Sequence, residues 1–215
     1  MGILRNLFSG KRQTTTPPQA ASGPPTAKPI SAEDKIRVFD EFGRELWISK
    51  DEWRRNVLPG ALKERWNDPA ELYCIVVSAL RDGFRSDLVE AAKHLHEIDP
   101  DPIRSACVWG IVLKEEGRLD EAERVFRDHI AQHGEEGSIL TNLAKVYSKR
   151  KDEAKVDEIL WHALEIDPNQ DNGCHWYEAR AREQGGPDAG LAAWRRIAAL
   201  LRAGARIGRR RDVLV

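Results

Sequence analysis

Two histidines spaced four residues apart come nearest to a reactive site in this sequence. His129 and His133 fall in a stretch whose apolar spacing predicts a helix, and residues at i and i+4 share one helix face. Two such imidazoles can bind a transition metal when a third ligand completes the set, which would make the chain a metalloenzyme. They lack the flanking glutamate of helical zinc-enzyme motifs, so we favour surface or core histidines and expect no metal.

Other candidates for chemistry are weaker. Residues 167–172 gather carboxylates and amides, but the spacing and closing glutamate of a calcium loop are missing, which favours loop and helix-capping roles. Cys74, Cys107 and Cys174 form no CxxC pair, which argues against a disulfide framework or zinc knuckle and suits a reducing cytoplasm. No GxSxG, P-loop or HExxH motif is present. We expect no enzymatic activity and no cofactor.

The charge balance also limits the function. Thirty-four Lys and Arg residues face 35 Asp and Glu, a formal net charge of -1, so no general field attracts nucleic acid or a membrane surface. The longest apolar stretches are far shorter than the roughly 20 residues that span a bilayer. These features predict a cytoplasmic protein with no specific nucleic-acid partner, and they disfavour membrane contact.

The N-terminal third has two predicted parts. Residues 1–34 are rich in Pro, Thr and Ala without a periodic apolar face, which is typical of a disordered arm. Residues 35–68 predict a small hairpin-helix module, because apolar residues alternate on both sides of a turn that contains Gly43. A capping box at Ser49 and Glu52 then predicts a helical stretch interrupted at Pro59-Gly60.

From residue 69 onward the spacing is helical and repeats. Leu140, Leu143, Ala144 and Tyr147 lie at i, i+3, i+4 and i+7, which is one face of a helix. The segments Ile-Asp-Pro100 and Ile-Asp-Pro168 lie 68 residues apart, or twice 34. Residues 69–202 therefore divide into about four units of 34 residues, starting at 69, 103, 137 and 171, and an Arg-rich tail follows at 203–215.

Each unit resembles a tetratricopeptide repeat. The unit at 103–136 carries the resemblance best, through Trp109-Gly110, Leu113, Gly117, Ala122 and Phe126. The fourth unit is the weakest, since Glu178 stands where a small residue is usual. The resemblance covers about two thirds of the chain and implies an all-α superhelix of helix-turn-helix units, here preceded by the hairpin and the arm.

The resemblance also implies a concave groove, lined by the first helix of each unit, that binds a peptide or another protein. By the geometry of the family, the groove residues in this chain are Arg104, Lys114, Thr141, Asn142, Lys145, Lys149, His175, Trp176 and Arg182. This face is polar and mildly basic, which suits an acidic partner. We expect a non-enzymatic adaptor.

Three alternatives remain open at this stage. The lysines of the groove could simply be solvated residues of a helix face. The chain could be a membrane-associated assembly factor or accessory subunit tethered by residues 2–12 and the Arg-rich tail. The last unit could also self-associate, because Leu191, Trp194, Ile197 and Leu200 would form an uncapped apolar face.

Overall fold

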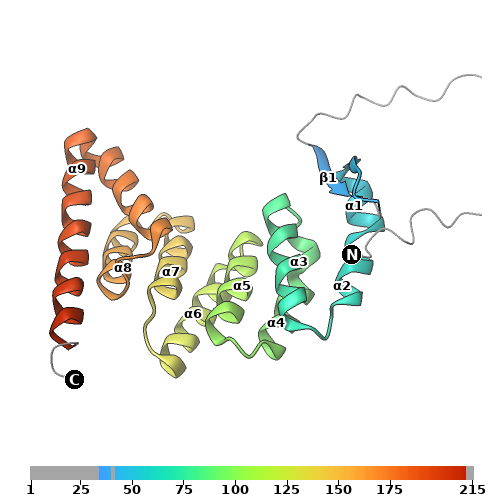
Figure 1. Cartoon of the computed structure of the whole chain (residues 1–215), viewed down its shortest axis with the longest axis horizontal. Coiled ribbons are helices and arrows are strands. Elements are labelled where there is room, and N and C mark those ends of the chain that lie inside the picture. Colours follow the sequence, from blue (N-terminus) through green and yellow to red (C-terminus); the bar gives the residue numbers. More distant parts are fainter. Residues whose placement is uncertain (1–33, 40–41, 212–215) are drawn as a thin grey trace, which may run out of the picture. The chain divides into compact units, whose positions relative to one another are not determined.

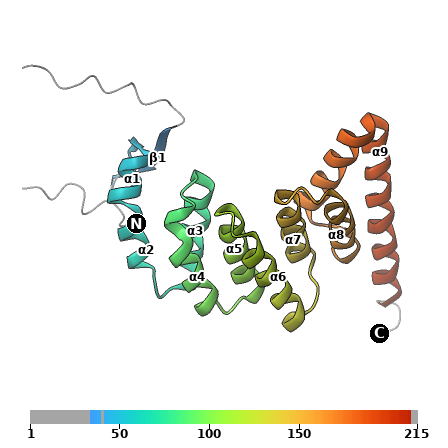
Figure 2. The ribbon, with the colours of Figure 1, turned by 180° about the vertical axis from the view of Figure 1, so that it is seen from behind.

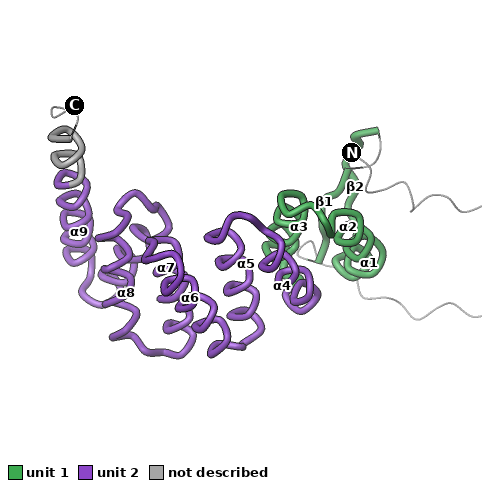
Figure 3. Tube along the Cα trace, turned by 90° about the horizontal axis from the view of Figure 1, so that it is seen from below, with its two compact units in different colours: residues 1–84 green, residues 85–215 purple. Residues whose placement is uncertain are grey.

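The computed structural model describes residues 34–39 and 42–211, with side chains described as far as residue 203. The chain divides into two compact units, residues 1–84 and residues 85–215, which Figure 3 shows in different colours. The predicted arm up to residue 33 and the last four residues of the predicted tail lie outside the described residues.

A two-stranded antiparallel hairpin begins the described part of the first unit, as the alternating apolar residues predict. Strand β1 (Lys35–Phe39) pairs with β2 (Glu45–Ser49) so that Ile36 lies opposite Ile48 and Val38 opposite Leu46. These four side chains are half-buried, whereas the alternate positions Arg37 and Trp47 are exposed. The period of two therefore turns one face of the hairpin toward the protein.

Three helices follow in this unit: α1 (Lys50–Asn56), α2 (Leu58–Glu64) and α3 (Pro69–Asp82). The backbone amide of Glu52 donates to the Ser49 side chain, as the capping box requires. The predicted interruption at Pro59-Gly60 is wrong by two residues, because the chain breaks at Val57 and Pro59 lies in the first turn of α2. Proline is tolerated there, since the first amides of a helix have no intrahelical partner.

The second unit contains only helices within its described residues: a short 3₁₀ turn η2 (Ser86–Leu88), then α4 (Val89–Ile98), α5 (Pro102–Glu115), α6 (Leu119–His133), α7 (Gly137–Lys149), α8 (Glu153–Ile166) and α9 (Asp171–Arg211). Figures 1 and 2 show from opposite sides that α5 lies beside α6 and α7 beside α8. Helices α5 and α7 also contact each other directly. Each helix thus packs against its neighbours in sequence.

The turns within the pairs fall where the 34-residue period predicts them, with one difference. Gly83, Gly117 and Lys151 all adopt positive φ at a helix end, the left-handed conformation that suits glycine. In the fourth unit the residue with positive φ is Gly186, one residue after the predicted Gly185, and Pro187 follows it. This break divides α9 into two limbs, which Figure 1 shows side by side at the C-terminal end.

Small residues allow the two helices of a pair to cross closely. A methyl group at Gly110 of α5 would lie 2.3 Å from the ring of Phe126 on α6, and that ring is fully buried. In the fourth unit the small residue lies on the second helix instead of the first. Gly190 on the second limb of α9 leaves room for the larger Glu178 on the first limb. The large eighth residue that weakened the repeat pattern is therefore matched by a glycine opposite.

Candidate protein-binding face

Helices α5 and α7 bring Cys107, Asn142 and Lys145 together, although 35 residues separate the first two. The Asn142 amide donates to the carbonyl of Ser138 at 3.0 Å and lies 3.5 Å from the Cys107 sulfur. The ammonium group of Lys145 lies 3.5 Å from the Asn142 amide oxygen. We call this group, with Lys114, the α5–α7 face.

The electrostatics of this face follow from partial burial. Burial, and then the neighbouring charge of Lys114, lower the pKa of Lys145. Lys114 contacts the Glu115 carboxylate at 2.9 Å, and Arg85 lies 3.4 Å from the same carboxylate. Burial raises the pKa of the Cys107 thiol, although Asn142 partly offsets this, so the thiol stays protonated at neutral pH. The face therefore combines a half-buried ammonium with an amide, while one carboxylate is shared by two other cations.

Two predicted groove residues bind partners outside the α5–α7 face. Arg104 binds Asp99 through two hydrogen bonds of 2.7 and 2.6 Å, at the turn between α4 and α5. Burial would raise the pKa of Asp99, but these hydrogen bonds outweigh it and the net shift is downward. Thr141 is buried, and its hydroxyl donates to the side chain of Gln170 at 2.7 Å. Both residues stabilise turns between helices.

Of the remaining predicted residues, Lys149 lies near the α5–α7 face. It is exposed at the end of α7, and its charge helps to lower the pKa of Glu115. The others have partners elsewhere. His175 meets Trp194 edge to face, with ring centres 5.4 Å apart, and Arg182 lies 3.3 Å from Glu178. Trp176 lines a separate cavity of about 490 Å³ between α7, α8 and α9, where the guanidinium of Arg180 lies 5.9 Å from its ring.

The apolar residues of the last unit differ in exposure. Ile197 is buried in a cluster with Leu164 and Cys174, so it is not available to a partner as the sequence suggested. Leu191 and Trp194 remain exposed, at 50% and 38%. Self-association through this unit stays a prediction.

Ion networks between helices are the part of the structure that sequence reasoning missed. Glu123 of α6 accepts hydrogen bonds from Arg127, from Tyr147 of α7 and from Arg150, the residue that follows α7. Burial alone would raise the pKa of Glu123, but these hydrogen bonds hold it at about 2. Arg180 of α9 similarly binds Glu153 and Asp157 of α8. The sequence separations of 23 to 27 residues gave no local signal.

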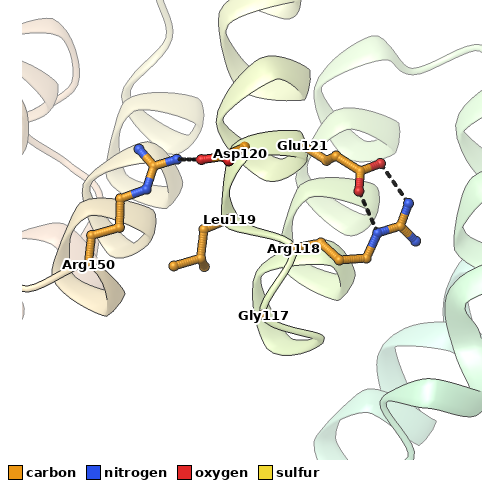
Figure 4. A pocket seen from close by; sticks show the side chains of 6 residues that line it. All are labelled: Gly117, Arg118, Leu119, Asp120, Glu121 and Arg150. Atoms are coloured by element: carbon orange, nitrogen blue, oxygen red, sulfur yellow. Dashed lines mark hydrogen bonds and ion pairs between the residues drawn. The ribbon is translucent and has the colours of Figure 1, made fainter.

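A cavity of about 360 Å³ lies beside the Glu123 network, but its charges are paired with each other. Figure 4 shows Arg118 bound to Glu121, and Arg150 bound to Asp120, among the residues that line it. The distances are 2.6 and 2.5 Å. These ion pairs account for the charged side chains that line the cavity without a bound ligand.

Three features together decide the fold: the helix pairs, the 34-residue spacing of their starts and turns, and the close crossing at Gly110 and Phe126. It is a tetratricopeptide-type repeat fold. No family model and no curated protein matches the chain. The similar solved structures include a crystal structure of MamA, at 16% identity over 73% of this chain and 91% of that one, with a TM-score of 0.49.

Two further solved structures are similar to this tetratricopeptide-type chain. One is residues 41 to the end of MamA from Desulfovibrio magneticus RS-1, at 17% identity over 71% of this chain and 86% of that one, with a TM-score of 0.48. The other is YrrB, described as a TPR protein with an unusual peptide-binding site, at 15% identity, 66% and 74% coverage and a TM-score of 0.43. Among the described residues, no helix is both long and apolar enough to cross a bilayer.

Proposed function

We propose that this protein is a non-enzymatic interaction adaptor that binds an acidic segment of another protein on the α5–α7 face. The observation that carries the proposal is the half-buried ammonium of Lys145, which lies beside the Asn142 amide and near Lys114. A partially desolvated ammonium interacts more strongly with a carboxylate than a fully solvated one, because the surrounding dielectric is lower. An adjacent amide can donate a second hydrogen bond to the same carboxylate.

The distribution of charge on this face supports an acidic partner. Glu115 already contacts Lys114 and Arg85, so its negative charge is shared between two cations. Lys145 contacts the uncharged Asn142 instead. A carboxylate from a partner would supply the counter-charge that the face lacks around Lys145.

The test is an affinity pull-down with the full chain as bait, read by mass spectrometry and followed by titration of each recovered partner. Wild type is compared with Asn142→Ala/Lys145→Ala and with Lys93→Ala, which removes one exposed lysine from α4. We expect the double variant to lose a partner that wild type and Lys93→Ala retain, because only the double variant removes polar side chains of the α5–α7 face. Binding should also weaken as salt is raised, but less steeply than for fully exposed charges, because a half-buried charge is screened less.

One result would exclude the proposal, and a second would show that the variant itself is unsuitable. Recovery of the same partners at the same affinity by all three proteins would exclude the α5–α7 face as the binding site. Loss of binding together with loss of helical circular dichroism in the double variant would trace the effect to unfolding, and Lys145→Gln, which keeps a polar side chain of similar length, would then replace it.

A further inference from the structure

A further polar cavity lies between α4, α5 and α6, and its lining shares no residue with the α5–α7 face. Its volume is about 340 Å³, and its lining includes His96, Ser105, Asp128, His129 and His133. Three imidazoles and two carboxylates, counting Asp99, therefore surround one space within the second unit. Neither the repeat packing nor the proposed function accounts for this concentration of ligand-type side chains.

His129 is the residue that indicates a ligand. Its side chain is only 5% exposed, and its Nε2 atom has no hydrogen-bond partner among the described residues. Buried polar atoms are almost always hydrogen-bonded, because leaving one unpaired is costly. In the neutral imidazole that carries its proton on Nδ1, this Nε2 atom has an unshared electron pair.

This tautomer is the one that metal-binding histidines adopt. A metal-ligating histidine usually donates its other ring N–H to a carbonyl or carboxylate, which fixes the ring and makes the free nitrogen a better ligand.

His133 supplies a second nitrogen at a suitable distance. Its ring centre lies 4.9 Å from that of His129, with the ring planes inclined at 39°. Two imidazole nitrogens each about 2.1 Å from a tetrahedral ion place their ring centres roughly 5 Å apart. The i, i+4 spacing on α6 therefore holds the rings near the separation that a chelated ion requires.

The other groups around the cavity favour a cation over an anion. The Asp99 carboxylate is neutralised by Arg104, which contacts it at 2.6 Å, while Asp128 contributes a further negative charge to the lining. The His96 ring is engaged with the Ser105 hydroxyl at 3.3 Å. In the described part of the chain no group of three or more His, Cys, Asp or Glu side chains is placed to hold a metal ion together, so the two imidazoles would be its only protein ligands here. A bound ion would thus keep solvent at its remaining positions.

We propose that His129 and His133 form a two-imidazole chelate for a late divalent transition ion, such as Ni²⁺, Cu²⁺ or Zn²⁺, in the cavity between α4, α5 and α6. Imidazole nitrogen is a preferred ligand of these ions, and affinity should rise toward Cu²⁺ in the usual order. The site is independent of the α5–α7 face, so either proposal can fail without the other.

The experiment is calorimetric titration of the full-length protein with Ni²⁺ or Zn²⁺ alone. Wild type is compared with His133→Gln, with His129→Gln and with the control His94→Gln, a histidine of α4 outside the cavity lining. We expect one ion per chain in wild type and in the control. Binding should be at least about tenfold weaker in each of the other variants, because losing a ligand should cost no less than losing a second-shell partner.

His133 is exposed, so His133→Gln keeps the test valid even if replacing the buried His129 disturbs the fold. Circular dichroism of each variant without metal identifies any such disturbance. The proposal is overturned if wild type binds no stoichiometric ion, or if His133→Gln binds the ion as tightly as wild type. A rise in the wild-type Tm with metal, absent in His133→Gln, would be a second supporting result.

Discussion

At the scale of single residues, Glu123 has the most perturbed environment in the second unit. It is one carboxylate with three donors, and two of those donors come from the next helix pair. Its pKa of about 2 lies below the ordinary value of 4.5. A lowered carboxyl pKa means that the folded protein prefers the charged form more strongly than the unfolded chain does.

The lowered pKa of Glu123 fixes the direction in which the free energy of unfolding changes with pH. The stabilisation from Glu123 is fully present above about pH 4.5 and is lost as the pH falls toward 2. Glu123→Gln should therefore lower the free energy of unfolding at neutral pH by up to about 3 kcal/mol and flatten its change between those two pH values. Urea unfolding at several pH values measures both effects. An unchanged pH profile in the variant would exclude this role.

Glu121→Gln is the matched control for Glu123→Gln. Glu121 also binds an arginine, Arg118, but both side chains are more than 40% exposed. Exposed pairs contribute little, so this change should cost clearly less stability than Glu123→Gln. Similar losses in the two glutamine variants would show that the shared network adds nothing to a simple ion pair.

At the scale of helices, the crossing of α5 and α6 depends on the size of two residues. Gly110→Ala should destabilise the protein by about 1–3 kcal/mol, because the new methyl group would overlap the Phe126 ring. Phe126→Ala should cost about 3–5 kcal/mol by leaving a cavity. Combining Gly110→Ala with Phe126→Leu should cost less than the sum of the two single changes, since the smaller side chain makes room.

Chemical denaturation of this set measures the coupling between the two positions. The control is Gly60→Ala, because a methyl group at Gly60 would meet nothing within 4 Å. That change should be neutral or stabilising, as alanine favours helix more than glycine does. Strict additivity of Gly110→Ala and Phe126→Leu would show that the predicted contact does not control the crossing.

Helix-level features were largely predictable from sequence, because they depend on local spacing. The hairpin register follows from alternation at Ile36 and Val38, and the turn at Gly117 follows from the 34-residue period. The break at Gly186 was predicted one residue early, because Gly185 and Gly186 are equally able to adopt positive φ and only the position of Pro187 separates them. At Lys151 the period correctly placed a turn without a glycine.

The candidate site was less predictable, because side-chain partners come from other helices. Lys145 and Asn142 were selected by family position, but their proximity to Cys107 depends on how α5 and α7 pack. Thr141 was selected from its repeat position in the same way, but it is buried and its hydroxyl binds Gln170 from the turn before α9. Arg104 was counted as a groove residue, but Asp99 binds it at the preceding turn. Position within a repeat does not reveal such competing partners.

At the scale of the whole molecule, each of the two compact units has its own buried residues. In the second unit the helices contact those of the same repeat and those of the neighbouring repeats. Stability in such an array is approximately the sum of terms within repeats and between neighbouring repeats. The Glu123 and Arg180 networks belong to the second kind, because each joins the second helix of one repeat to the first helix of the next.

This nearest-neighbour packing has a consequence for folding speed. A chain whose helices contact mainly those one or two positions along the sequence closes short loops, so little entropy is lost before the first native contacts form. The second unit should therefore refold within milliseconds or faster, as other proteins with mainly local contacts do. Stopped-flow refolding of the full chain, followed by helical circular dichroism, should show most of the amplitude in that time. A dominant phase lasting seconds would mean that distant parts of the chain must meet before any helix pair becomes stable.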